Sequence, residues 1–210
     1  MKKFELTTEF ITNAFGKKLF RIKALVEFGD VKAGELGGYV EKEGNVSQAG
    51  NAWVYGNARV SGDARVSGNA WVYGNAWVYG DARVSGDARV SGDARVSDNA
   101  RVYGNAWVYG DARVYGNARV YGNARVYGDA RVYGNADYAL VQGFGTEFRC
   151  TTFYRGKNKK IMVNCGCFHG DLEGFRKQVK ETRNGKIAKE YLMIADLMEY
   201  HFTSEDSSDE

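Results

Sequence analysis

The sequence predicts a mainly β protein whose central part is a parallel β-solenoid. Two observations carry this prediction. Glycine recurs at every sixth position from Gly38 to Gly134 with one exception, Asp98, and valine recurs at every sixth position from Val54 to Val132 without a break. A short period repeated this often is the signature of a repeat architecture, in which like units stack and share one continuous core.

Each repeat reads Gly, Asn or Asp, Ala, Arg or Trp, Val, and Tyr or Ser. The last four positions alternate between small or apolar residues and other residues, which is the period of a strand with Ala and Val on one face. The first two positions form a turn pair, because Gly, Asn and Asp adopt positive φ more readily than other residues. A meander of hairpins fits poorly, since successive hairpins would bury alternate faces.

The order Val, two variable residues, Asn or Asp, Ala and one variable residue resembles the hexapeptide repeat of left-handed parallel β-helices, the fold of the hexapeptide acyltransferases. The resemblance implies three hexapeptides, about 18 residues, in each coil. One coil buries about three valines, worth roughly 5–9 kcal/mol, whereas ordering its backbone costs on the order of 18–36 kcal/mol. A single coil is therefore unstable, and the stack needs neighbours and a cap at each end.

The flanking segments supply these caps. A strand is predicted over residues 18–26, and two strands are predicted near 147–154 and 160–165. Two amphipathic helices are predicted to begin near Asp171 and Lys186. The residues expected to face inward on these helices are Leu172, Phe175 and Val179, then Tyr191, Ile194, Leu197 and Met198. The predicted parts are an N-terminal β cap over 1–37, the solenoid over 38–139, a small α+β domain over 140–203, and an acidic disordered tail over 204–210.

Three further segments resemble a recurring phage- and prophage-encoded protein: Phe-Gly-Asp-Val-Lys-Ala-Gly at 28–34, Leu-Gly-Gly at 36–38, and Val-Asn-Cys-Gly-Cys-Phe at 163–168. The resemblance implies a phage-type origin. The first ten residues lack the apolar stretch of a signal peptide, and no apolar run has membrane-spanning length. With three cysteines in no framework spacing, we expect the cytoplasm of an infected or lysogenic bacterial host.

Wrapping three hexapeptides per coil sorts the outward residues into three faces. The first stacks Trp53, Trp71, Arg89, Trp107 and Arg125, beside Tyr55, Tyr73, Ser91, Tyr109 and Tyr127. The second stacks Arg59, Trp77, Arg95, Arg113 and Arg131. An apolar column on one side of a protein indicates a contact surface. The predicted face for a partner or for a homo-oligomer, trimer or dimer, is Trp53, Trp71, Trp107, Tyr55, Tyr73 and Tyr109.

The third face stacks the Arg ladder, which is Arg65, Arg83, Arg101 and Arg119. At its end nearer the C-terminus, Asn99 and Asn117 replace the corner aspartates, so the charge is less compensated. Tyr103 and Tyr121 also replace serine there. Guanidinium groups bind phosphate and tyrosine rings stack on bases. Arg101, Arg119, Tyr103 and Tyr121 are therefore predicted to bind an anion, with an ordinary solvated surface as the alternative.

Catalysis is not predicted. The resemblance to acyltransferases implies a histidine near a subunit interface and a loop ejected from the coils. The two histidines, His169 and His201, both follow the repeats, and no loop interrupts the hexapeptides, so a general base is missing. Cys165 and Cys167 are one residue apart, closer than is usual for zinc, and are predicted to be buried thiols. We expect no catalytic residue, metal or cofactor.

The sequence therefore predicts a non-enzymatic binding or scaffold protein of phage type. By analogy with other small binding proteins of phages, its partner is a host protein, and inhibition of a host defence protein is the natural purpose. The first alternative is sequestration of an anionic nucleotide or nucleic acid by the Arg and Tyr ladders. The second is a hexapeptide acyltransferase.

Overall fold

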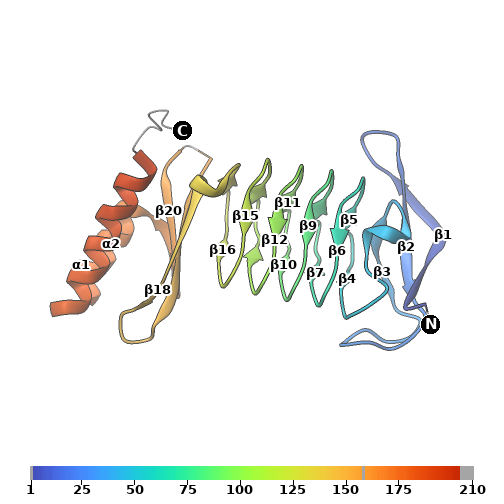
Figure 1. The fold of residues 1–210 in the computed structure, drawn as a ribbon, viewed down its shortest axis with the longest axis horizontal. Helices are drawn as coiled ribbons and strands as arrows, with labels where there is room; N and C mark the ends of the chain where they lie inside the picture. Colours follow the sequence, from blue (N-terminus) through green and yellow to red (C-terminus); the bar gives the residue numbers. More distant parts are fainter. Residues whose placement is uncertain (1, 158, 204–210) are drawn as a thin grey trace.

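The computed structural model describes residues 2–157 and 159–203, and it confirms the mainly β fold. The coils of the solenoid form a stack with an antiparallel sheet at one end and a sheet with two helices at the other (Figure 1). The predicted acidic tail lies outside the described residues. Among the described residues, no helix is long and apolar enough to cross a membrane.

The solenoid strands are two residues long and begin every six residues. Their bounds are β4 (Trp53–Val54), β5 (Arg59–Val60), β6 (Arg65–Val66), β7 (Trp71–Val72), β8 (Trp77–Val78), β9 (Arg83–Val84), β10 (Arg89–Val90), β11 (Arg95–Val96), β12 (Arg101–Val102), β13 (Trp107–Val108), β14 (Arg113–Val114), β15 (Arg119–Val120), β16 (Arg125–Val126) and β17 (Arg131–Val132).

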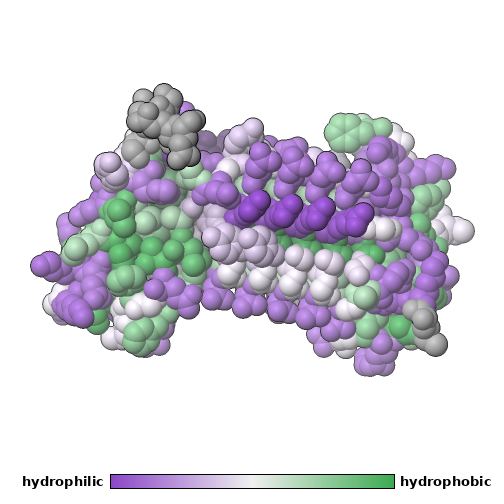
Figure 2. Space-filling view, in the orientation of Figure 1, coloured by the Kyte–Doolittle hydropathy of each residue, from purple (hydrophilic) through white to green (hydrophobic). Residues whose placement is uncertain are grey.

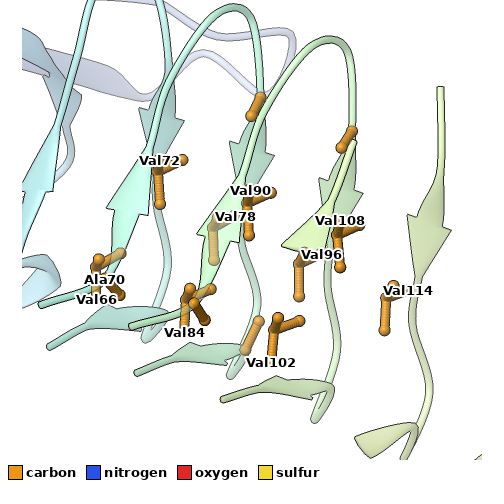
Figure 3. Close-up of a cluster of buried hydrophobic side chains, with 14 of the residues drawn as sticks. Val66, Ala70, Val72, Val78, Val84, Val90, Val96, Val102, Val108 and Val114 are labelled. Carbon is orange, nitrogen blue, oxygen red and sulfur yellow. The ribbon is translucent and has the colours of Figure 1, made fainter. Parts of the chain in front are cut away.

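Each strand pairs in parallel with the strand one coil further along, so that Trp53 lies opposite Trp71 and Arg65 lies opposite Arg83. This spacing of 18 residues gives three sheets and confirms three hexapeptides per coil. The repeat alanines and valines from Ala52 to Val132 are at most 1% exposed. Figure 3 shows valines of successive coils pointing into the interior.

The first coil departs from the predicted register. The glycine period begins at Gly38, but Tyr39 of β3 (Leu36–Val40) pairs with Arg59, and Val46 bridges to Val66. Both spacings are 20 residues, whereas the regular coils have 18. The short 3-10 helix η1 (Glu43–Asn45) lies between these two pairings. The chain between Val46 and Trp53 therefore realigns the strands, and the regular hexapeptide register begins at β4.

The corners of the coils require positive φ. Gly86 has φ +68°, and a Cβ placed there would lie 2.9 Å from the backbone nitrogen of Gly104 in the next coil. Asp98, which occupies a glycine position of the repeat, keeps φ at +56°. Its Oδ2 accepts a hydrogen bond of 3.0 Å from the backbone N–H of Gly116. The side chain thus partly offsets the backbone strain that a residue other than glycine has in this conformation.

The N-terminal cap is a sheet of β1 (Phe4–Thr12), β2 (Lys18–Ala24) and β3, and its last strand continues into the solenoid sheet. The predicted strand over 18–26 corresponds to β2, whereas β1 was not predicted. Phe4 and Ile22 are fully buried and extend the solenoid core beyond the first coil. The predicted covering of the first coil is confirmed.

The C-terminal sheet runs β18 (Tyr138–Phe144), β19 (Arg149–Arg155), β20 (Ile161–Cys165) and β21 (Phe168–Asp171), all antiparallel. Its β19 contacts β16 and β17 of the last coil. The short 3-10 helix η2 (Asn135–Asp137) leads into this sheet. Of these strands, β19 and β20 were predicted and β18 and β21 were missed.

Two helices pack on this sheet, α1 (Leu172–Thr182) and α2 (Gly185–Thr203). Leu172, Phe175 and Val179 of α1 are buried as predicted, and Asp171 caps α1 by accepting from the N–H of Gly174. On α2 the prediction for Leu197 was wrong, because this side chain points outward. The buried residues of α2 are Tyr191, Ile194, Ala195, Met198 and Phe202.

The two ends of the solenoid have opposite polarity. In every regular coil the backbone N–H donates to a carbonyl of the next coil, as from Trp53 to Ala70. Carbonyls of the first coil and N–H groups of the last coil therefore need partners from outside the stack. At the N-terminal end the partners are donors: Lys3 Nζ contacts the carbonyls of Gly50 and Ala52 at 3.2 and 2.9 Å.

At the C-terminal end the partners are acceptors. Asn135 Oδ1 accepts from the N–H of Arg119 at 3.0 Å, and Thr152 Oγ1 accepts from the N–H of Arg125 at 3.0 Å. One further bond has the opposite sense, because the hydroxyl of Tyr138 donates to the carbonyl of Arg119. The C-terminal unit is thus joined to the last coil by polar groups that match its open edge.

Candidate functional site

The predicted Trp column is not a continuous exposed surface. Trp53 is 0% exposed, because the N-terminal cap covers it. Its ring contacts Phe4 and Phe28 at centroid distances of 5.8 and 5.3 Å, both edge to face. Trp53 therefore belongs to the core of the cap, and its assignment to a partner-binding face was wrong.

The remaining members of this column form a Trp–Arg ladder of Trp71, Arg89, Trp107 and Arg125. The guanidinium of Arg89 lies between two indole rings, 5.1 Å from Trp71 and 5.0 Å from Trp107, and that of Arg125 lies 5.1 Å from Trp107. A cation over an aromatic face is attracted by the ring quadrupole. The tryptophans are therefore separated by charge, which makes the column less apolar than the sequence indicates.

The tyrosines beside this ladder are half-buried. Tyr55 packs its ring against Trp71 at 5.6 Å, and Tyr109 stacks on Tyr127 at 4.4 Å. Tyr73 lies between them in the column, also half-buried. The structure thus brings the five other residues of the predicted partner face to one side of the solenoid. Contacts with neighbouring rings and arginines use part of the surface of Tyr55, Trp71, Trp107 and Tyr109.

The Arg ladder has the predicted register. Arg65, Arg83, Arg101 and Arg119 pair successively along one sheet, and all four are exposed. Figure 2 shows a row of strongly hydrophilic side chains along the solenoid. In the described part of the chain, none of these arginines has a carboxylate oxygen within 4.0 Å, and the corner Asp63 pairs with Lys42 instead. The ladder is therefore a row of positive charge without direct ion pairs, in which Asp63 still attracts Arg65 at longer range.

The Arg ladder ends in a cleft of about 420 Å³ between the last coil and the C-terminal sheet, which we call the Tyr–Arg cleft. The lining residues are Tyr103, Arg119, Tyr121, Gly122, Asn135, Tyr138, Ala139 and Leu140. Three of the four residues predicted to bind an anion thus meet in one cavity. Arg101 pairs with Arg119 one coil away but does not line the cleft.

Aromatic rings and one free guanidinium dominate the chemistry of this cleft. The rings of Tyr103 and Tyr121 stack at 5.3 Å and 13°, and Tyr121 remains 52% exposed. The ring of Tyr138 is perpendicular to that of Tyr121, with the centroids 6.4 Å apart, and burial raises the pKa of the Tyr138 hydroxyl. None of the described residues that line the cleft carries a carboxylate. The cleft can therefore hold a planar ring against tyrosine and an anionic group against Arg119.

A second cleft of about 500 Å³, the Arg–amide cleft, lies on the other side of the same corner of the last coil. It is lined by Asn123, Arg125, Gln142, Arg149, Cys150, Asn164, Gly166 and Cys167. Asn123 Nδ2 donates to Gln142 Oε1 at 3.3 Å on the wall of this cleft. Its described lining again contains arginines and no carboxylate.

His169 and the cysteines lie at the junction with the C-terminal unit. The imidazole contacts the ring of Tyr127 at 4.3 Å, and its Nε2 lies 2.9 Å from the hydroxyl of Tyr154. Partial burial lowers the pKa of His169, and the nearby Asp129 opposes this shift. The described residues contain no group of three or more His, Cys, Asp or Glu side chains arranged to hold a metal ion.

The prediction of buried thiols on one strand was wrong for Cys167. Cys165 ends β20 and is half-buried, Gly166 has φ +60°, and Cys167 is exposed in the turn before β21. The chain turns between the two cysteines, so they do not share the face of one strand.

Sequence reasoning missed the part of each cleft that the C-terminal sheet supplies. Asn135, Tyr138 and Leu140 follow the point where the repeat decays, and Arg149 belongs to a strand with no repeat pattern. The available signal was the decay itself, because a solenoid end needs a cap and the cap contacts the last coil.

The coils are similar to a known repeat. Six segments match the YdcK Beta solenoid repeat, residues 52–68, 64–80, 82–94, 94–110, 112–126 and 124–136. No curated protein matches the chain. The matched segments lie within the coils, and both flanking units are outside them. The chain is a solenoid repeat protein whose coils are similar to the YdcK Beta solenoid repeat.

Proposed function

We propose that this chain is a non-enzymatic binding protein, and that its site is the Tyr–Arg cleft at the end of the Arg ladder. The ligand is an anion that carries a planar ring, with a nucleotide as the chemical class. The observation that carries the proposal is the presence, in one cavity without a carboxylate, of the stacked Tyr103 and Tyr121 rings and the free guanidinium of Arg119.

The rest of the Arg ladder supports this proposal by attracting the ligand. A row of exposed positive charges raises the local concentration of anions and speeds their arrival. Between residues 51 and 135 the chain has ten arginines and seven aspartates, so the solenoid carries three net positive charges. These charges act over about 8–10 Å at ordinary ionic strength, which makes binding sensitive to salt.

Absence of catalysis is part of the proposal. A hexapeptide-type acyl transfer needs a general base beside its acceptor. Neither cleft is lined by a histidine, and His169 contacts Tyr127 and Tyr154 at the junction. Sustained turnover of an acyl-coenzyme A by the purified chain would contradict this part of the proposal.

Mass spectrometry of copurifying small molecules tests the ligand. The chain is captured from bacterial lysate at low salt, denatured, and the released molecules are identified. We expect a ring-bearing anion from the unaltered chain and none from the Arg119→Gln, Tyr121→Ala double variant. An Arg65→Gln variant is the matched control, because Arg65 occupies the same ladder far from the cleft. Equal release from all three chains would reject the cleft as the site.

A second candidate partner is a protein of the cytoplasm, and one specific observation favours it. Tyr133, a residue type that protein interfaces favour, is 62% exposed on the last coil. In this version the chain is a phage-type scaffold that engages and inhibits a host protein, such as a component of a defence system. Capture of proteins from a bacterial lysate, followed by their identification, tests this candidate. A host protein that stays bound in high salt and is lost with Tyr133→Ala supports a protein partner. A captured protein whose binding does not change with substitutions on the coils contradicts it.

A further inference from the structure

The Arg–amide cleft has no part in the function proposed above, and its chemistry differs from that of the Tyr–Arg cleft. It lies where β16 of the last coil contacts β19 of the C-terminal sheet (Figure 1). None of its described lining residues carries an aromatic ring or a carboxylate. Besides one glycine, the lining consists of two arginines, three side-chain amides and two thiols. A cleft of this composition offers positive charge and hydrogen-bond donors to a ligand without a ring.

The two guanidinium groups come from different units, and each is held in place. The backbone N–H of Arg125 donates to Thr152 of β19, and the Arg125 guanidinium lies 5.1 Å from the ring of Trp107. Arg149 begins β19 and lies against the turn between β20 and β21. A Cβ placed at Gly166 of that turn would lie 2.6 Å from Nη1 of Arg149. Glycine at this position, with φ +60°, therefore leaves the space that the guanidinium occupies.

No ion pair neutralises these two charges within the described part of the chain. Neither Arg125 nor Arg149 has a carboxylate oxygen of a described residue within 4.0 Å. Glu147 lines the neighbouring cavity together with Arg149, but it does not line this cleft. Burial raises the pKa of the Cys150 thiol, whose S–H donates to the carbonyl of Asn123 at 3.3 Å. This thiol is therefore uncharged at neutral pH, and the cleft keeps both positive charges for a ligand.

A column of corner side chains ends at the cleft and adds a donor. Asn69 Nδ2 donates to Asp87 of the next coil at 3.1 Å, and this direction is fixed because a carboxylate only accepts. The same sense continues from Asn105 to Asn123 at 3.2 Å and from Asn123 to Oε1 of Gln142 at 3.3 Å. Because Oε1 of Gln142 is used as the acceptor, its amino group remains as a donor on the wall of the cleft.

We propose that the Arg–amide cleft is a second binding site, and that its ligand is a small phosphate monoester without an aromatic ring. A phosphate monoester carries a charge of about −1.5 to −2 at pH 7, which matches the two guanidinium groups. Its oxygens are strong acceptors, which matches the free amino group of Gln142. The cleft has no ring on which a base could stack, so its ligand differs in class from that of the Tyr–Arg cleft. The inference does not rest on the function proposed for that cleft.

Protection of a thiol from iodoacetamide tests the site in the full chain, with inorganic phosphate and glycerol phosphate as probes. Cys150 lines this cleft, whereas Cys165, also half-buried, lines the neighbouring cavity instead. At a probe concentration ten times the dissociation constant, alkylation of Cys150 should slow about tenfold, because only about a tenth of the chain is then free. Alkylation of Cys165 should not change. Sodium chloride at equal ionic strength is the control, and equal slowing of both thiols, or of neither, rejects the site.

Arginine variants locate the bound anion. Arg125→Gln and Arg149→Gln should each weaken the protection of Cys150 by about tenfold or more, the effect of losing one charge-assisted contact. Arg149→Lys keeps the charge and should bind the probe more tightly than Arg149→Gln. The matched control is Arg119→Gln in the Tyr–Arg cleft, which should leave the protection of Cys150 unchanged. Protection that persists in both glutamine variants of the cleft overturns the proposal.

A comparison of dianions tests the class of ligand. Succinate carries two negative charges and no phosphate, and we expect it to protect Cys150 less than either phosphate probe does. Protection by succinate that equals or exceeds that by phosphate would overturn the phosphate class. Nucleotide binding that responds to Arg119→Gln but not to Arg149→Gln reports on the Tyr–Arg cleft alone, so failure of one site is distinguishable from failure of the other.

Discussion

The ring of Tyr121 stacks on that of Tyr103 at 5.3 Å and 13°, one coil apart on the same face of the solenoid. In the first half of this face the corresponding positions are Ser67 and Ser85. The stack therefore exists only where the solenoid meets the C-terminal sheet. The backbone is the same in every regular coil, but the side chains on this face differ at the end of the solenoid that forms the Tyr–Arg cleft.

The Trp–Arg ladder predicts that two arginines at the same position of successive hexapeptides contribute unequally to stability. Arg89→Ala removes two ring contacts, at about 0.5–1 kcal/mol each, so we expect a loss of about 1–2 kcal/mol in the free energy of unfolding. Arg95→Ala is the control, because Arg95 is exposed and no cation–ring contact involves it in the described chain. Urea denaturation of both variants measures the difference, and equal losses would mean that the ring contacts contribute nothing.

The narrow core predicts a large effect at Val96, which is fully buried among the repeat valines. Val96→Asp places an unpaired carboxylate between coils, with no partner for its charge, and should cost several kcal/mol, on the order of 4 or more. The neighbouring Arg95→Gln, whose side chain points outward, should change the melting temperature little. A mild effect of Val96→Asp on thermal unfolding would contradict the register of the coils.

Asp98 allows a test of the corner. Asp98→Ala keeps a Cβ at positive φ and removes the hydrogen bond to Gly116, so it should cost about 1–3 kcal/mol. Asp98→Gly also removes the bond but restores the residue that this conformation favours, and it should be nearly neutral. Thermal unfolding of the two variants distinguishes the two effects. If Asp98→Gly lowers the melting temperature as much as Asp98→Ala, the hydrogen bond and not the backbone conformation dominates the loss of stability.

His169 predicts a pH dependence of stability. Its pKa is lowered in the folded chain, so below its usual value of about 6.5 the unfolded chain binds more protons. The contribution of the neutral imidazole to the free energy of unfolding is fully present above about pH 6.5. It declines as the pH falls below this value and is lost below the pKa of His169 in the folded chain. The groups facing the imidazole are Tyr127, Tyr154 and Asp129. Denaturation of the His169→Gln variant between pH 7 and 5 should show a smaller decline than the unaltered chain, and an identical decline would assign the effect elsewhere.

Periodicity predicted what is local to the repeat. The inward position of each valine, the spacing of 18 residues and the three columns of outward residues all follow from six-residue units that alternate in and out. Periodicity does not predict what covers a column from outside. Trp53 occupies the same repeat position as Trp71, yet it is buried, because β1 and the loop around Phe28 fold back over the first coil.

The other features that the sequence did not predict have the same origin. The sequence shows that Arg89 follows Trp71 in its column, but not that a guanidinium placed between two rings makes the column charged. Cys165 and Cys167 have the spacing of strand neighbours, and the turn at Gly166 separates them. In the Tyr–Arg cleft, Arg119 and Tyr121 come from the repeat, whereas Tyr138 and Leu140 come from a strand without periodicity. When a site lies at the junction of two units, the sequence predicts only the half that the repeat supplies.

Calorimetry with nucleotides at low salt is the most direct test of the central claim. We predict salt-sensitive binding that Arg119→Ala weakens by about tenfold or more and Tyr121→Ala by about fivefold or more, since one charge-assisted contact is worth about 1.5–3 kcal/mol and one stacked ring about 1–3 kcal/mol. Arg101→Ala, next to the cleft, should weaken it less than Arg119→Ala, and Arg65→Ala, the control at the far end of the ladder, should weaken it least. Binding that is absent at low salt, or equally sensitive to all three arginines, would contradict the account.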